Sequence, residues 1–237
     1  MLWYKAWLET RARFLISLLG IVALCSYFVF HGNQQALSYT KIDWYYGVLH
    51  SGHTLLATMW VMAVTLLMMG GLLREKAVGA SSFTLALPVS RARLMSVRVA
   101  VGLIQAMALV LIPWATMFLV ASTTGKTHSI SQASFHIVLL AGGGLIFFAI
   151  ALLISSIIEG EYTAPIVSYG VVITIAIALG DSFRAYSPWT FITGSEYFDR
   201  KTALLVGPIP WIHIAMCVLL AAFLTVISVK VMLRREF

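Results

Sequence analysis

Six long apolar runs dominate this sequence, and they decide in which solvent the chain can fold. Each is long enough to cross about 30 Å of hydrocarbon as an α-helix that rises about 1.5 Å per residue. Only 11% of the residues are charged, against about a quarter in soluble domains. We therefore expect one all-α transmembrane domain over residues 1–237. The predicted spans are Phe14–Phe30, His53–Leu73, Val99–Ala121, Phe135–Ile158, Ala164–Asp181 and Pro210–Val229.

The basic residues predict an orientation for these spans. If the N-terminus is cytoplasmic, eleven of the 16 Lys and Arg residues lie on the cytoplasmic side. Cytoplasmic flanks of membrane proteins collect such residues, so both termini are predicted to be cytoplasmic. The same rule explains the net charge of +7 without a nucleic-acid partner. The cytoplasmic set is Lys5, Arg11, Arg13, Arg74, Lys76, Arg91, Arg93, Arg98, Lys230, Arg234 and Arg235.

Two flanking segments have amphipathic or aromatic character. In residues 1–13, Trp3, Tyr4 and Trp7 share one helical arc opposite charged residues, which predicts an amphipathic helix in the membrane interface. The alternative is a plain basic flank. Residues 182–209 are long for a loop and rich in aromatic residues. We expect short external helices there that fold back against the outer leaflet, with an ordinary aromatic-rich loop as the alternative.

The predicted cytoplasmic loop 74–98 differs from the other loops because its middle is apolar. Phe83, Leu85 and Leu87 are placed to form one side of a short helix, which Pro88 then ends. Ser90 is placed to cap a new helix that runs into the third span. A short apolar helix with flanking arginines is typical of an element that docks into a partner's groove. A connecting loop anchored at lipid headgroups is the alternative.

This segment, REKAVGASSFTLALPVSRARLMSVR, resembles the intracellular loop of permease subunits of ATP-binding-cassette transporters, in the type-2 permease family. The six-span layout is also similar, although it is less specific than the loop. The residues that match the family's pattern are Glu75, Gly79, Leu85, Leu87, Pro88, Val89, Ser90, Arg91 and Arg98.

The resemblance implies that the loop is a coupling helix held in a groove of a separate ATPase subunit. It implies a plasma-membrane permease that pairs with a second permease subunit, and ATP and Mg bound by the ATPase rather than by this chain. It also implies a transporter, most often an exporter, of lipid-like, peptide or drug-like substrates. The short acidic loop of Glu159, Glu161 and Tyr162 is either a second ATPase contact or a solvated turn.

No motif in the chain predicts catalysis or a cofactor. Gly125, Lys126 and Thr127 suggest a phosphate-binding loop, but the glycine that the motif requires five residues earlier is replaced by Val120. We therefore expect no enzyme activity and no ATP hydrolysis in this chain. His50 and His53 are three residues apart, but the sequence places no third ligand near them, so we interpret them as interfacial polar residues rather than as a metal site.

Residues inside the spans predict packing rather than an ion path. Mid-membrane charges are nearly absent, which argues against a proton- or sodium-coupled carrier. Mild polar residues such as Thr65 and Gln105 either line a substrate path or join helices by hydrogen bonds. Gly142, Gly143 and Gly144 predict close helix approach, and the cysteines Cys25 and Cys217 are expected to be packing residues. Two other classes stay open: a membrane enzyme or maturation factor acting on lipids, and a non-transporting sensor or assembly protein.

Overall fold

The computed structural model describes residues 2–36, 44–68, 90–123, 129–158, 163–178, 187–199 and 204–234. Almost all of these residues are helical. The helices are α1 (Leu2–Ala36), α2 (Trp44–Leu67), α5 (Arg91–Thr123), α6 (Ile130–Ile157), α7 (Thr163–Ala178), α8 (Pro188–Thr193) and α9 (Trp211–Arg234). A two-stranded antiparallel hairpin, β1 (Phe198–Asp199) and β2 (Leu204–Leu205), pairs Phe198 with Leu205 and Asp199 with Leu204.

Within the described residues, four helices are long and apolar enough to cross a membrane. They are Leu2–Phe30, Ala92–Thr123, Ile130–Ile157 and Trp211–Arg234. They contain the first and third predicted spans and all but one terminal residue of the fourth and sixth. The second and fifth predicted spans coincide with shorter apolar helices, Gly52–Leu67 and Pro165–Ile175. A total of six crossings stays a prediction.

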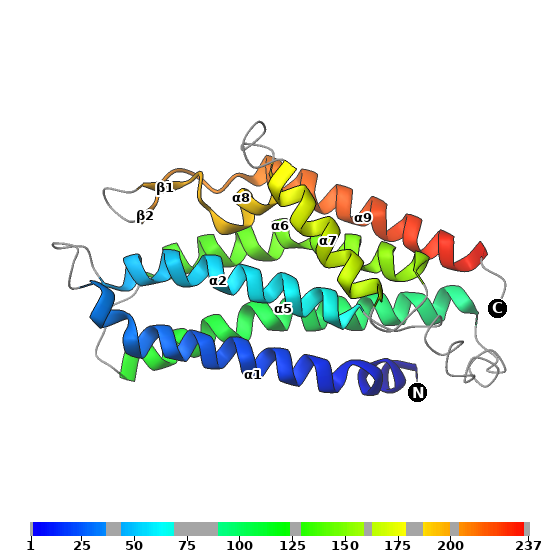
Figure 1. The fold of residues 1–237 in the computed structure, drawn as a ribbon, viewed down its shortest axis with the longest axis horizontal. Helices are drawn as coiled ribbons and strands as arrows, with labels where there is room; N and C mark the ends of the chain where they lie inside the picture. The colour runs from blue at the N-terminus through cyan, green and yellow to red at the C-terminus, as the bar shows by residue number, and fades with distance from the viewer. Residues whose placement is uncertain are drawn as a thin grey trace.

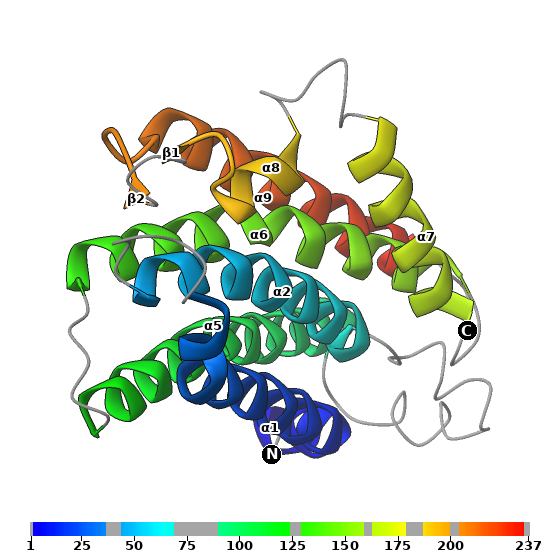
Figure 2. The ribbon, with the colours of Figure 1, turned by 60° about the vertical axis from the view of Figure 1, so that its left-hand side comes forward.

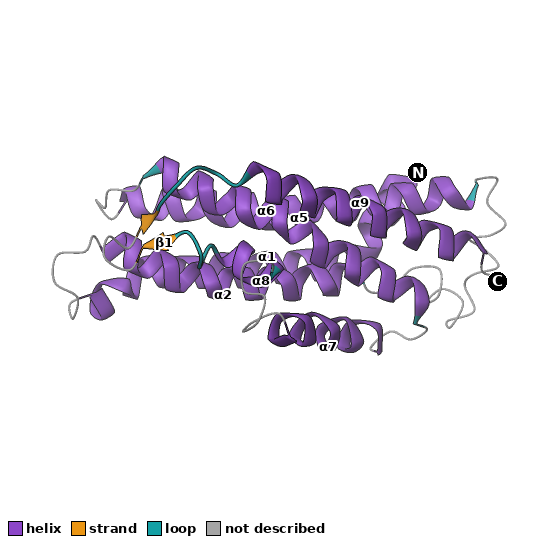
Figure 3. Ribbon diagram, turned by 90° about the horizontal axis from the view of Figure 1, so that it is seen from above, coloured by secondary structure: helices purple, strands orange, loops and turns teal. Residues whose placement is uncertain are grey.

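The long helices lie side by side, with α6 in the middle of the bundle (Figures 1 and 2). Helix α6 packs against α2, α5, α7, α8 and α9, whereas α1 packs against α2 and α5. The beginning of α1, the beginning of α5 and the end of α9 lie at one end of the bundle, and the β-hairpin lies at the other (Figure 1). Helix α7 flanks the bundle (Figure 3).

Three consecutive glycines explain how α6 approaches three neighbours at once. A Cβ on Gly142 would lie 2.7 Å from Ile214 of α9, and one on Gly143 would lie 2.6 Å from Phe191 of α8. A Cβ on Gly144 would lie 2.5 Å from the Trp60 ring of α2. Successive residues of a helix are about 100° apart, so the three glycines face three different elements. The predicted close approach is confirmed.

The structure describes most of both flanking segments. Helix α1 is continuous from Leu2 to Ala36, so residues 1–13 are its first turns and no break separates them from the predicted first span. Their place in a membrane interface stays a prediction. In the predicted external segment, α8 is one short helix, ended by Gly194 in the left-handed conformation with φ of 68°. Because Phe191 contacts Gly143, α8 packs near the middle of α6 rather than at its end.

Candidate functional site

The site that the sequence predicts is only partly within the described residues. Ser90, Arg91 and Arg98 belong to the described part of the chain, at and after the beginning of α5. The other predicted coupling residues, Glu75, Gly79, Phe83, Leu85, Leu87, Pro88 and Val89, lie outside the described residues, as do Glu159, Glu161 and Tyr162. Their roles stay predictions.

Ser90 begins α5 as the sequence predicts. Its side-chain oxygen accepts a hydrogen bond from the backbone N–H of Arg93 at 3.3 Å, and α5 begins at the next residue, Arg91. A serine in this position satisfies one of the backbone donors that the first turn of a helix leaves unpaired. From this cap α5 continues for 33 residues, so it joins the predicted docking segment to the far end of the bundle.

Arg98 lies two turns into α5 and faces α1. Its guanidinium forms an ion pair with Glu9 at 3.4 Å, and the two side chains are 16% and 30% exposed. Lys5 reaches the same carboxylate at 3.8 Å. Apolar side chains, among them Ala6 and Met95, complete a small pocket around these charges. The structure therefore places Arg98 in a contact between helices of this chain.

A buried hydrogen bond joins α1 and α5 two helical turns further along α5. The Gln105 amide donates to the Thr10 hydroxyl at 2.7 Å, and that hydroxyl donates to the Ala6 carbonyl at 3.1 Å. Gln105 and Thr10 are 2% and 4% exposed. We call Glu9, Thr10, Arg98 and Gln105 the α1–α5 polar seam. Sequence reasoning did not identify it, although Arg98 and Gln105 are seven residues apart and therefore share a helix face.

A second buried polar cluster lies toward the hairpin end and joins residues far apart in the sequence. His53 of α2 and His136 of α6 are each 2% exposed, and their ring centroids are 4.3 Å apart. Trp114 of α5 lies next to both rings, with centroids 6.3 Å from His53 and 5.7 Å from His136. His53 is therefore buried among the helices, and its predicted place at the depth of the membrane interface stays a prediction.

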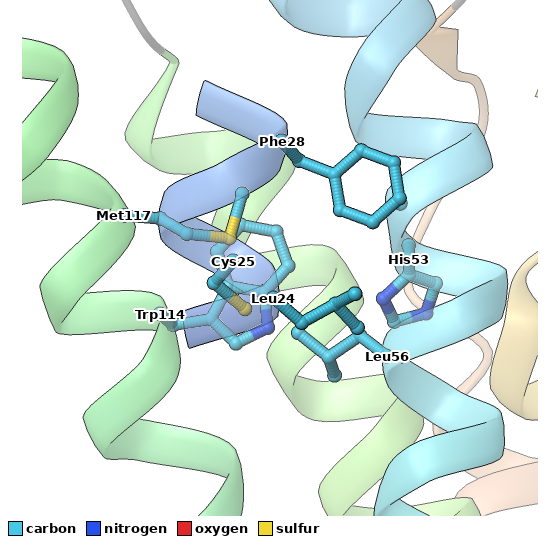
Figure 4. A pocket seen from close by; sticks show the side chains of 8 residues that line it. Leu24, Cys25, Phe28, His53, Leu56, Trp114 and Met117 are labelled. Atoms are coloured by element: carbon cyan, nitrogen blue, oxygen red, sulfur yellow. The ribbon is translucent and has the colours of Figure 1, made fainter. Parts of the chain in front are cut away.

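A small pocket adjoins this cluster between α1, α2 and α5 (Figure 4). Cys25, His53, Trp114 and Met117 line it together with apolar side chains. Within the described residues, no group of three His, Cys, Asp or Glu side chains is arranged to hold a metal ion. Cys25 is 3% exposed and belongs to the main apolar core, which confirms it as a packing residue.

The outer faces of the bundle identify the class of protein. On α9, Ile212 and Leu219 are 76% and 70% exposed, and α1 exposes Ile16 by 71%. Apolar faces this continuous are stable only when lipid or protein covers them. Together with the four long apolar helices, they define a helical protein embedded in a membrane. No protein-family model matches the chain, and no curated protein matches it.

Proposed function

We propose that this chain is the membrane-spanning permease subunit of an ATP-driven transporter. In this proposal, two such subunits enclose a pathway in the cell membrane, with both termini in the cytoplasm. Separate ATPase subunits bind ATP and Mg, and they dock on the segment 74–98. Export of a lipid-like, peptide or drug-like substrate is part of the proposal because of the resemblance to type-2 permeases.

The observation that carries the proposal is the course of α5. The helix begins at the Ser90 cap, immediately after the predicted docking segment, and runs through the bundle. The α1–α5 polar seam ties its first four turns to α1. A displacement transmitted to Ser90 would therefore move α5 and α1 together, because the seam joins the two helices. This is the mechanical property that a coupling element requires.

Leu87→Asp tests the docking step. The tagged chain is purified in mild detergent from its native membrane, and co-purifying proteins are identified by mass spectrometry. We expect an ATPase subunit with the wild type, and its loss with Leu87→Asp while membrane insertion is unchanged. Ser122→Asp is the matched control, because it places the same carboxylate on an exposed position at the opposite end of the bundle. Its complex should be intact.

A wild-type complex without any ATPase, or an equal yield of ATPase with Leu87→Asp, would contradict the docking proposal. Activity on lipids by the purified chain alone would favour the membrane enzyme instead. An ATPase partner whose turnover does not respond to any substrate would favour the sensor.

The Glu9–Arg98 ion pair allows the transmission of motion from the ATPase to the helices to be tested separately from docking. Arg98→Gln should keep the ATPase bound but lower the substrate-stimulated part of its turnover, because Arg98 binds Glu9 of this chain. Glu9→Gln should have a similar effect, and the double variant should be no worse than either single variant. Loss of the ATPase with Arg98→Gln, or additive losses in the double variant, would contradict a transmission role.

A further inference from the structure

The segment that carries α8 and the β-hairpin is hydrogen-bonded to the bundle through side chains of α6 and α2. We call residues 187–199 and 204–205 the α8–β cap. The Gln132 side chain of α6 donates to the Leu205 carbonyl at 3.0 Å and accepts from the Leu205 N–H at 2.9 Å. His53 of α2 donates from Nε2 to the Ile192 carbonyl at 2.8 Å. The hydrogen bond from α2 therefore depends on an imidazole.

The two histidines form one unit with these hydrogen bonds. His136 donates from Nδ1 to the Gln132 carbonyl at 2.9 Å, and its ring meets the His53 ring edge to face at 4.3 Å. A carbonyl oxygen only accepts hydrogen bonds, so these contacts place a hydrogen on Nε2 of His53 and on Nδ1 of His136. Each ring makes its contact in the neutral form, and a second proton would turn it into a cation.

The surroundings of the pair disfavour such a cation. Each ring is 2% exposed, so a charge there would lose nearly all its hydration. A charge on one ring would also face the other histidine at 4.3 Å. The Trp114 indole, whose buried N–H has no hydrogen-bond partner among the described residues, lines the same pocket as His53 (Figure 4). The titratable groups on the neighbouring elements include Cys25 of α1, which lines the same pocket as His53. They also include Glu196, Tyr197 and Asp199 of the cap and His213 of α9, which lies beside Phe191.

We propose that His53 and His136 are an acid-sensitive latch that holds the α8–β cap on α2 and α6 while both rings are neutral and releases it when they are protonated. The direction follows from linkage: a state that exposes the rings to water binds more protons at low pH, so acid favours it. An imidazole in water titrates near pH 6.5. Between pH 7.5 and 5.5 the released population should rise about 10-fold if one ring takes up a proton, and up to about 100-fold if both do.

Hydrogen exchange of the cap amides measures this release directly. The backbone N–H of Leu205 donates to Gln132 of α6, so its exchange reports release of the cap from the bundle. The N–H groups of Gly194, Ser195 and Tyr197 donate to carbonyls within the cap and report its internal structure. Exchange is followed by mass spectrometry on the full chain in lipid nanodiscs at pH 7.5 and 5.5, with each rate corrected for its intrinsic pH dependence. We expect the protection of the Leu205 amide to fall at least 10-fold at pH 5.5, while the middle of α6 stays protected.

Three variants assign the effect to the pair. His53→Gln retains an amide donor for the Ile192 carbonyl but does not titrate, so it should keep the cap protected at both pH values. His136→Asn retains a donor for the Gln132 carbonyl and should reduce the pH effect, which serves as a second test if His53→Gln does not fold. His213→Gln is the control, because His213 lies beside Phe191 of α8 with ring centroids 6.1 Å apart but is exposed. It should behave as the wild type.

Three results would overturn the latch. One is equal wild-type protection of the cap at both pH values. Another is an equal acid-induced loss in the wild type and in both pair variants. The third is a simultaneous loss of protection in α6, which would show that acid unfolds the bundle rather than releasing the cap. None of these outcomes depends on whether the chain transports a substrate.

Discussion

Gly144→Ala should destabilise the bundle although alanine favours helices. The added Cβ would lie 2.5 Å from Cζ3 and 2.6 Å from Cη2 of Trp60. Reaching an ordinary contact distance of about 3.4 Å requires the ring or the helix to move by about 0.9 Å. Trp60 has no free space, because its side chain is 0% exposed, and its indole N–H donates to the Ala106 carbonyl of α5 at 3.0 Å. The movement therefore disturbs α2, α5 and α6 together.

The costs of Gly144→Ala exceed the gain from its higher helix propensity, so the free energy of unfolding should fall. Overpacking a core costs about 1–3 kcal/mol, and weakening the buried indole hydrogen bond adds about 0.5–1.5 kcal/mol. Replacing a helical glycine by alanine returns at most about 1 kcal/mol. We expect a net loss of about 1–3 kcal/mol. Gly20→Ala is the matched control, because Gly20 is helical and has nothing within 4 Å of its added Cβ. It should be neutral or stabilising by up to about 1 kcal/mol.

The assay is reversible unfolding in mixed micelles with increasing sodium dodecyl sulfate, followed by far-ultraviolet circular dichroism. Trp60→Phe, which removes the outer ring atoms, should make Gly144→Ala nearly neutral in that background. The reasoning fails if Gly144→Ala stays within about 0.5 kcal/mol of the wild type, below the smallest overpacking cost. It also fails if Gly20→Ala loses as much stability, or if the Trp60→Phe background does not change the cost.

Two further predictions concern the ends of the bundle. Thr10→Val leaves the buried Gln105 amide without its acceptor and should lower the free energy of unfolding by about 0.5–2 kcal/mol. The double variant Thr10→Val with Gln105→Leu should recover most of this stability. Additive losses in the same unfolding assay would contradict the prediction. Burial raises the pKa of Tyr197, and the Glu196 carboxylate raises it further. Its stabilising contribution should therefore be complete below about pH 10, the ordinary value of a tyrosine, and be lost as the pH rises through the raised pKa. A tyrosinate absorbance titration of wild type minus Tyr197→Phe should show one late-titrating phenol, and an ordinary or early titration would refute this.

Local features of the fold were predictable because their causes are local. Length and hydropathy identify the helices of the first, third, fourth and sixth spans. Ser90 predicts the beginning of α5, because a serine hydroxyl before helix-forming residues can accept a hydrogen bond from a backbone N–H of the first turn. The run Gly142–Gly144 predicts close contacts of α6 with its neighbours, because only glycine lets neighbouring elements approach the backbone this closely.

Tertiary pairings were not predictable from one sequence. His53 and His136 are separated by 83 positions, and nothing in the spacing of either indicates that α2 and α6 bring their rings together. His53 therefore looked like an interfacial residue beside His50. Residues 1–13 were separated from the first span because of their amphipathic pattern, which gives way to an apolar run after Arg13. No helix-breaking proline lies between residues 2 and 36, and the helix continues through that point.

The two ends of the bundle are held by different physical means, and this makes them separable in experiments. The Glu9–Arg98 ion pair is partly exposed, so salt screens it, with a Debye length of about 8 Å at physiological ionic strength. The His53–His136 pair is buried, and its contacts require only one hydrogen on each ring. If both rings are neutral, as the latch requires, salt has little charge there to screen, whereas protons act on the rings directly. Raising salt at neutral pH should therefore loosen α1 from α5 without changing protection of the cap. Lowering pH to 5.5 at constant salt should loosen the cap first. Raised salt and lowered pH could instead loosen the α1–α5 contact and the cap equally. In that case the two ends would respond together, and the polar seam and the latch would not act independently.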